Sequence, residues 1–194
     1  MKKILTLITL LVSLTAYSQV YDGITQPTKY RLIVPVTFEN QPVVSPLLGY
    51  KYQPLKSFSI TPVVQYNLNT ETFIPQVWLN YNIKERFYIL SRSILNTKTE
   101  QYFHTLSATA KLDRGFMIDA TWQNMYNGKF ADGDRLQFLG GIAHKKIVFN
   151  AGYSVRSHKG FVTNLRYKVT DWNWIQVKYD GGLNLFSFQT VLQI

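Results

Sequence analysis

Three side chains, Ser93, His104 and Asn124, have the types needed for a nucleophile, a general base and an orienting group. A serine hydroxyl becomes a nucleophile when an imidazole takes its proton, while a third polar group holds the imidazole in position. The three residues lie far apart in the sequence. They can therefore act together only if residues 86–126 fold into elements that place them side by side.

Lysine and arginine residues form a second set with possible chemistry, because they share one face of the alternating segments described below. Cationic side chains around a water-filled interior favour the passage of anions. The opposite interpretation is that these long side chains fill an interior and pair with one another and with water. The basic residues expected to line the interior are Lys84, Arg92, Lys111, Arg156, Arg166, Lys168 and Lys178, with Arg135 and Lys145 on the same face and Asp119 and Asp180 as its few acids.

Apolar and polar residues alternate with a period of two in segment after segment, and a helical period is nearly absent after the first residues. Such alternation is typical of strands with one apolar and one polar face. Twelve strands are predicted, each close to the roughly 9–11 residues with which a tilted strand crosses a bilayer. They cover residues 29–38, 43–53, 58–67, 73–83, 86–95, 102–112, 116–126, 135–144, 147–156, 161–169, 173–180 and 185–194.

The connections between these strands alternate in length, which is typical of bacterial barrels with short periplasmic turns and longer external loops. The short connections are residues 84–86, 113–115 and 145–146, and the longer ones are residues 68–72, 96–101 and 127–134. With both termini in the periplasm, the longer loops lie outside the cell. The sequence therefore predicts an all-β fold, a closed antiparallel transmembrane barrel.

The first residues have the order of a secretory signal peptide. Two lysines precede an apolar run from Ile4 to Leu14, and small residues follow up to Ser18. The apolar run is shorter than the roughly 20 residues that a transmembrane helix needs. We therefore expect residues 1–18 to be a signal peptide and residues 19–194 to form a single barrel domain in the outer membrane.

The composition also suits a protein whose outer surface meets lipid. Charged residues make up 16% of the chain and aromatic residues 15%, whereas ordinary soluble domains have about 25% charged residues. Removal of Lys2 and Lys3 leaves 19 of the 21 lysine and arginine residues against 11 acids, a net charge of +8. In an exported chain this excess favours lipopolysaccharide and small anionic solutes as partners rather than nucleic acid. The absence of cysteine excludes disulfides and a lipoprotein anchor.

Over nearly the whole mature chain, the sequence resembles the outer-membrane β-barrels of Gram-negative bacteria. The alternating strands, the aromatic residues near strand ends such as Phe58 and Tyr66, and the alternating C-terminal strand over residues 186–194 carry this resemblance. The signal peptide is similar to those of Bacteroidota. The resemblance implies a closed barrel of about twelve strands, or of ten if residues 29–53 form a periplasmic plug or an irregular arm.

On the predicted strands, Ser93 lies opposite His104, and His104 lies opposite Asn124, if the intervening connections close symmetrically. Facing residues on adjacent strands have Cβ atoms about 4.5–5.5 Å apart, and all three side chains would point outward near the outer leaflet. A Ser-His-Asn set on the lipid-facing wall of a twelve-stranded barrel resembles outer-membrane phospholipase A. The resemblance implies roles as nucleophile, base and orienter in lipid hydrolysis. In that family the His and Ser lie two apart on one strand, whereas here they lie on neighbouring strands.

The main functional prediction is a small outer-membrane barrel, either a passive pore or a structural barrel, with a basic lumen that would favour anions. Two alternatives stay open: a lipid hydrolase built on Ser93, His104 and Asn124, and an accessory barrel subunit of a larger outer-membrane complex. The main prediction includes no enzyme activity and no cofactor. A metal site is not expected, because the histidines have no ligand companions at useful spacing. The expected partners are outer-membrane lipid, lipopolysaccharide and small anionic solutes; the sequence does not identify a protein partner.

Overall fold

The structure is a computed structural model that describes residues 30–38, 42–84, 86–98, 101–125, 134–170 and 173–193. The predicted signal peptide, residues 1–18, lies outside the described residues. Within the described ranges, no helix is long and apolar enough to cross a membrane.

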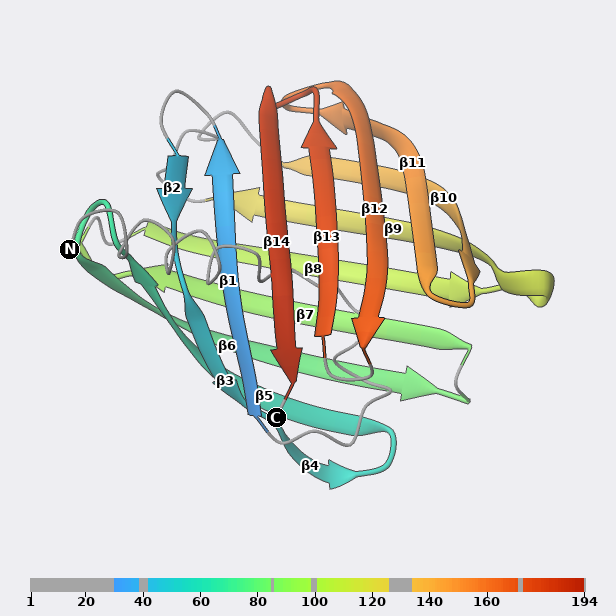
Figure 1. The fold of residues 1–194 in the computed structure, drawn as a ribbon, viewed down its shortest axis with the longest axis horizontal. Helices are drawn as coiled ribbons and strands as arrows, with labels where there is room; N and C mark the ends of the chain where they lie inside the picture. Colours follow the sequence, from blue (N-terminus) through green and yellow to red (C-terminus); the bar gives the residue numbers. More distant parts are fainter. Residues whose placement is uncertain are drawn as a thin grey trace.

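The described residues form one antiparallel sheet that closes on itself (Figure 1). From β5 to β14, each strand pairs with the next one along the chain. The elements are β1 (Tyr30–Phe38), β2 (Pro42–Val44), β3 (Leu47–Tyr50), β4 (Tyr52–Leu55), β5 (Phe58–Asn67), β6 (Thr72–Ile83), β7 (Phe87–Asn96), β8 (Gln101–Lys111), η1 (Asp113–Gly115), β9 (Phe116–Met125), β10 (Arg135–His144), β11 (Ile147–Arg156), β12 (Gly160–Thr170), β13 (Asn173–Asp180) and β14 (Leu185–Gln193).

The first and last strands close the barrel. β1 pairs antiparallel with β14 from Arg31 opposite Gln193 to Phe38 opposite Phe186, and Figure 1 shows the two strands side by side. In hydrocarbon an unpaired backbone N–H or C=O costs several kcal/mol, so a sheet that spans a membrane has to lose its edges in this way. The closure confirms the predicted closed antiparallel barrel.

Residues 42–55 form one irregular strand of the wall rather than a continuous one. Here β2 and β3 pair with β1, and β3 and β4 pair with β5. The break between β2 and β3 falls at Pro46, which has no N–H to donate to a ladder, and a register shift marks β4, which contains Pro54. Counted as one strand, this segment brings the wall to the predicted twelve. The ten-stranded alternative fails because β1 itself closes the barrel.

The two ends of the barrel differ in their connections, as predicted. The turn end carries the short connections, such as residues 84–86 and 145–146, together with the start of β1 and the end of β14. The loop end carries the longer connections, such as residues 68–71 between β5 and β6; most of the predicted loop over residues 127–134 lies outside the described residues. At the turn end Gly115 has a positive φ of 83°, and a Cβ there would approach the Ala143 carbonyl oxygen at 2.3 Å. Only glycine fits that turn.

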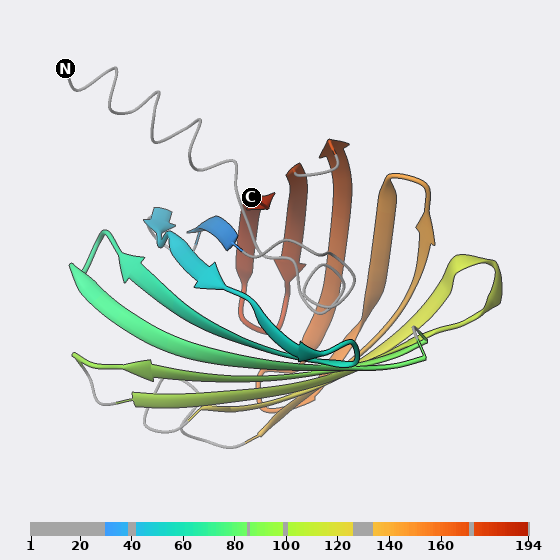
Figure 2. The same cartoon turned by 90° about the horizontal axis from the view of Figure 1, so that it is seen from below.

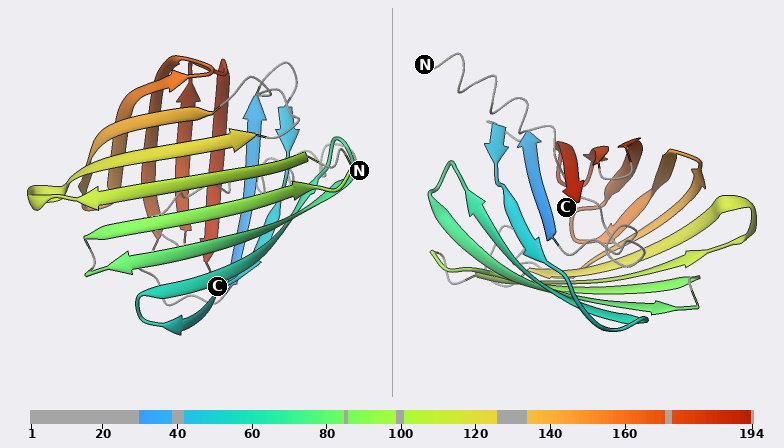
Figure 3. Two further views of the ribbon diagram at one scale, coloured as in Figure 1. Left: turned by 180° about the vertical axis from the view of Figure 1, so that it is seen from behind. Right: turned by 60° about the horizontal axis from the view of Figure 1, so that its bottom comes forward.

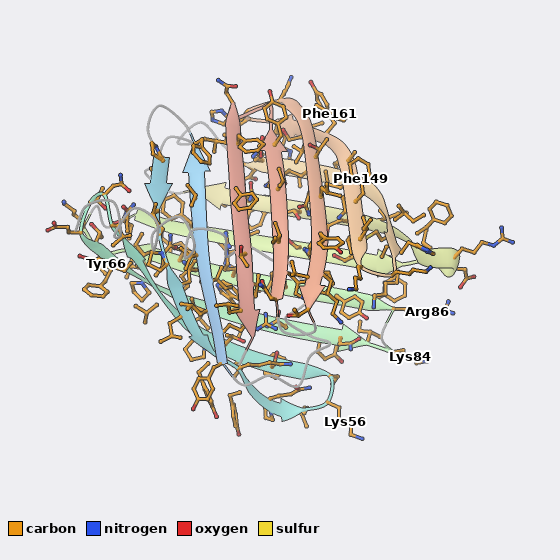
Figure 4. All side chains as sticks on the ribbon, viewed as in Figure 1. Lys56, Tyr66, Lys84, Arg86, Phe149 and Phe161 are labelled. Atoms are coloured by element: carbon orange, nitrogen blue, oxygen red, sulfur yellow. The ribbon has the colours of Figure 1, made fainter. Side chains whose placement is uncertain are left out.

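The outer face of the wall carries many large apolar side chains. Strand residues alternate between exposed apolar and buried side chains, as in β6, where Val77 and Leu79 are exposed while Gln76 and Trp78 are buried. Figure 2 shows the strands curving around the interior that the buried side chains fill. Aromatic pairs lie outside near both ends: Tyr66 packs against Phe73 at a centroid distance of 4.7 Å. Figure 4 shows Phe149 and Phe161 on this outer side.

The interior is divided between an apolar cluster and polar side chains. Figure 3 shows from two further sides how the sheet brings the cyan strands at the start of the chain beside the red strands at its end. Eight buried residues from this half of the wall form the interior apolar cluster: Ile33, Leu47, Val63, Trp78, Tyr88, Leu90, Trp174 and Val191. The inward residues of β8 to β12 are mostly hydroxyl, amide and charged groups.

Candidate functional site

The lumen is strongly basic. Among the described residues, the inward charged side chains are cationic at eight positions and acidic at two. The cations are Arg31, Lys51, Arg92, Lys111, Arg135, Arg166, Lys168 and Lys178, and the acids are Asp119 and Asp180. Because strand alternation sends these side chains away from lipid, they define the electrostatic character of the interior.

Five of the seven predicted lumen residues do face inward: Arg92, Lys111, Arg166, Lys168 and Lys178. Lys84 needs correction, because it lies in the turn after β6 with a positive φ of 49° and is exposed. Alternation does not reach it, since the last pair of β6 with β7 is Ile83 opposite Phe87. Arg156 lies opposite Arg135 in the end pair of β11, at the rim of the loop end, where its side chain is 56% exposed and pairs with Asp134.

Three lumen cations that were absent from the main predicted set are also buried: Arg31, Lys51 and Arg135. Arg135 had been assigned the correct face. The other two lie in the proline-containing region, where alternation is weak. Alternation counted from the buried Ile33 places Arg31 on the lumen face. Nothing in the sequence indicates that the chain leaves regular strand structure at Lys51, between β3 and β4.

Aromatic rings hold four of the cations against the lumen wall. The Arg92 guanidinium lies 6.0 Å from the centroid of Trp78, and the Lys111 ammonium lies 4.8 Å from that of Tyr88. The charged groups of Arg166 and Lys168 lie 5.9 and 5.8 Å from Trp174. Aromatic rings attract cations through their quadrupole without neutralising them, so this packing orders the side chains and keeps the interior positive.

Asp180 is the centre of a charged network at the loop end. Arg135 donates from Nη1 to the Asp180 carboxylate at 2.9 Å and from Nη2 to Ser154 Oγ at 3.0 Å. Gln137 Nε2 donates to the same carboxylate at 3.3 Å, and Lys178 Nζ lies 3.7 Å from it. These contacts join β10, β11 and β13 across the lumen and brace this part of the wall.

Asp119, the second lumen acid, is held by hydroxyl groups. Thr109 Oγ1 donates to it at 2.7 Å and Thr121 Oγ1 at 3.0 Å, and the hydroxyls of Ser107 and Thr121 lie 2.9 Å apart. Hydrogen bonds of this kind satisfy a buried carboxylate. The polar wall from β8 to β9 is therefore a connected network.

Two cavities lie in the lumen at the loop end. The first, of about 170 Å³, is lined by Thr37, Arg92, Gln123, Arg135, Gln176, Lys178, Asp180, Leu183, Leu185, Ser187 and Gln189. The second, of about 210 Å³, is lined by Gln65, Ile74, Arg92, Ile94, Asn96, Phe103, His104, Thr105 and Gln123. Arg92 and Gln123 line both. The two cavities therefore lie on either side of these two side chains.

The predicted polar row is present on the outer face. Ser93 lies opposite His104, and His104 lies opposite Asn124, with the predicted register. Ser93 Oγ lies 3.1 Å from His104 Nδ1, and the Tyr102 hydroxyl donates to Ser93 Oγ at 3.0 Å. The direction of the bond between Ser93 and His104 depends on the tautomer of the imidazole. The catalytic role of Ser93, His104 and Asn124 stays a prediction.

No group of three or more histidine, cysteine, aspartate and glutamate side chains within the described ranges is arranged to hold a metal ion. The chemistry that the described lumen offers is therefore that of its charged, amide and hydroxyl groups.

Solved structures with this architecture include outer-membrane channels. An outer membrane channel from Pseudomonas putida F1 matches with a TM-score of 0.63 at 11% identity, over 92% of this chain and 100% of that chain. The KdgM porin matches with a TM-score of 0.59 at 11% identity, over 84% of this chain and 99% of that chain. The chain has the antiparallel β-barrel fold of these two proteins.

A second structure of the KdgM porin, in complex with disordered oligogalacturonate, matches equally well, with a TM-score of 0.59. No family model matches the chain, and no curated protein matches its sequence. The β-barrel fold and the many large apolar side chains exposed on its outer face suit a place in the outer membrane.

Proposed function

We propose that the barrel is a passive outer-membrane pore that favours anions. The observation that carries the proposal is the charge of the lumen: eight inward cations against two acids among the described residues. One of the acids, Asp180, is paired with Arg135. The other seven inward cations then face a single remaining acid, Asp119, among the described residues. The positive electrostatic potential of a basic lumen attracts anions and repels cations.

The distribution of charge along the lumen supports passage rather than binding at a single point. Arg92, Arg135 and Lys178 lie toward the loop end, while Lys111 and Lys168 lie toward the turn end. Conduction needs several sites that each bind weakly, so that an ion can move from one to the next. The aromatic rings beside Arg92, Lys111 and Lys168 attract these cations without neutralising them.

The structural relatives support the proposal at the level of fold. A barrel of this architecture, the KdgM porin, has been solved with oligogalacturonate, a polyanion. For the present chain, acidic solutes are the class that the charge of the lumen favours.

Planar-bilayer recording tests the proposal. The refolded protein should give discrete conductance steps, and in a gradient of KCl the reversal potential should have the sign of chloride selectivity. Steps with the sign of potassium selectivity, or folded protein that gives no steps, would contradict it. Heat-modifiable migration on a gel verifies in each preparation that the barrel is folded.

A further inference from the structure

The second loop-end cavity has an apolar patch on the lumen wall. Ile94 and Phe103 lie opposite each other on β7 and β8, and Ile74 of β6 lines the same cavity. All three side chains point inward and are half-buried. Inward positions of a membrane barrel are ordinarily polar, because they meet water. Three apolar side chains that meet at one cavity therefore offer contacts that an inorganic ion cannot use.

The cavity has the size of a six-membered ring with a short substituent. Its volume is about 210 Å³, and a cavity of about 150 Å³ lined by leucine, isoleucine and phenylalanine is large enough to bind benzene. Phe103 adds a ring on which an aromatic ligand can stack in an offset or edge-to-face arrangement. Because such ring pairs are favourable beyond the area that they bury, the lining favours an aromatic ring over a flexible chain.

A chain of three side chains orients the polar group at the edge of this patch. The Trp78 indole N–H donates to Gln76 Oε1 at 2.9 Å, and Gln76 Nε2 in turn donates to Gln65 Oε1. An indole nitrogen can only donate. Gln76 must therefore accept with its oxygen, and Gln65 must accept with its own oxygen from Gln76. The Nε2 group of Gln65 is then the free end of the chain.

Gln65 Nε2 is placed to donate to a ligand. Gln65 lies opposite Ile74, and both residues line the cavity. Among the described residues, the bond from Gln76 is the one side-chain hydrogen bond that Gln65 makes. Hydrogen bonds in series polarise one another, so the chain behind Gln65 strengthens its N–H groups as donors. An acceptor oxygen beside Ile74 would complete the chain.

We propose that this cavity binds small uncharged aromatic compounds that carry one acceptor oxygen. The ring packs on Ile94 and Phe103, and the oxygen accepts a hydrogen bond from Gln65 Nε2. An ion would lose hydration against these apolar side chains, which is unfavourable, whereas an uncharged oxygen needs only its hydrogen bond. The proposal goes beyond the proposed anion pore and does not depend on it, because the groups that hold this ligand carry no charge.

Fluorine NMR on the folded barrel in detergent micelles tests the inference with two probes of one shape. The probe para-fluoroacetophenone has a carbonyl oxygen where para-fluoro-α-methylstyrene has a methylene group. Protein-free micelles give the baseline for partition into detergent. Above that baseline, both probes should give a saturable shift. If neither probe does so, the cavity does not hold an aromatic ring and the inference is wrong.

The role of the donor is tested by Gln65→Met, which removes the amide with little change in size. Binding of the ketone should weaken about two- to tenfold, the range expected for one hydrogen bond, while binding of the alkene stays the same. The matched control is Asn164→Leu, because Asn164 is a buried inward amide on β12 that lines neither cavity. Equal losses of both probes in Gln65→Met, or equal losses of the ketone in the two variants, would overturn the assignment.

The apolar contact is tested by Phe103→Ala. Both probes should bind about tenfold more weakly or worse, because the variant loses the ring pair and apolar area. The control is Met117→Ala, since Met117 is a buried inward apolar residue on β9 that lines neither cavity. Heat-modifiable migration verifies that each variant is folded. If Phe103→Ala weakens binding no more than Met117→Ala does, the ring lies elsewhere and the inference is wrong.

The two proposals fail separately, because no conductance enters these binding measurements. Chloride-selective steps without saturable probe binding would leave the pore and remove the aromatic site. Ketone binding that depends on Gln65, together with the absence of conductance steps, would keep the site and remove the pore.

Discussion

The inner and outer faces of the same strands have opposite chemistry. On β6, Val77 and Leu79 point outward and are exposed, while the adjacent Gln76 and Trp78 point inward and are almost completely buried. In a soluble protein the apolar side would be the buried one. The inversion means that the outer face is matched to hydrocarbon and the inner face to water and ions.

The comparison also shows where the two faces get their stability. Among the described residues, the polar contacts of the outer face are local, such as that between Ser93 and His104. The inner face is joined across the barrel by Arg135 and Asp180 and along the wall by the hydroxyl groups around Asp119. Lipid stabilises one face and hydrogen bonds stabilise the other, so substitutions on the two faces should fail in different ways.

The largest effect is expected from a charge placed on the outer face. Val77→Arg should lower the free energy of unfolding in lipid by about 2–4 kcal/mol, the loss expected for arginine near the bilayer midplane. Urea titration in lipid vesicles, followed by heat-modifiable migration, measures it. The control is Gln123→Arg, where the new charge enters the lumen cavities. Equal losses for the two variants would mean that the faces are wrongly assigned.

A smaller loss is expected when the inner network is broken. Asp180→Ala removes the carboxylate that Arg135 binds, and hydrogen bonds to charged groups contribute about 1.5–3 kcal/mol. The comparison variant is Asp134→Ala, which removes the exposed partner of Arg156 and should change stability by less than about 1 kcal/mol. The same titration measures both. If the Asp134 variant is the less stable of the two, the network does not brace the wall.

Reversal of lumen charge should change selectivity with little change in folding. The double variant Arg166→Glu and Lys168→Glu should lower the chloride-to-potassium permeability ratio about tenfold, which corresponds to about 1.4 kcal/mol. Reversal potentials in a KCl gradient measure it. Lys84→Glu, in the exposed turn after β6, serves as the control and should leave the ratio nearly unchanged. A ratio that is the same in all three proteins would mean that the lumen does not select.

A small loss of stability is expected at the polar row of the outer face. Ser93→Ala removes the hydrogen bonds to His104 and Tyr102 and should lower stability by about 0.5–1.5 kcal/mol, with conductance unchanged. Phospholipid hydrolysis by the wild type and by the variant tests the catalytic hypothesis at the same time. Hydrolysis that the variant loses would support it, and its absence from both proteins would end it.

Much of the fold follows from alternation, because a period of two fixes both the strand and its facing. The facing of Arg92, Lys111 and Arg166 followed directly, as did the register between Ser93 and His104, which needs only a symmetric connection. At Lys84 the prediction failed, because this residue lies in the exposed turn after β6 and not on the strand. The sequence pattern carries no signal for the residue at which the strand ends and the turn begins.

The lumen could be predicted in character but not in arrangement. A basic interior follows from the facing of lysines and arginines. The contact between Arg135 and Asp180 does not, because it crosses the lumen between strands that are not neighbours. Likewise the two cavities depend on how residues from β1, β7, β9 and β14 meet in space. Such distances depend on the curvature of the closed wall, which alternation does not specify.

The pairing of β1 with β14 has a consequence for biogenesis. The strand made first finds its second neighbour only when the strand made last arrives, so the barrel cannot assemble in stages as the chain is synthesised. Until then two strand edges stay unpaired, which hydrocarbon does not tolerate. A sheet whose β1 and β14 edges are unpaired is therefore unsuited to hydrocarbon until these two strands meet. Entry into the bilayer and completion of the hydrogen-bond ladder then become a single event.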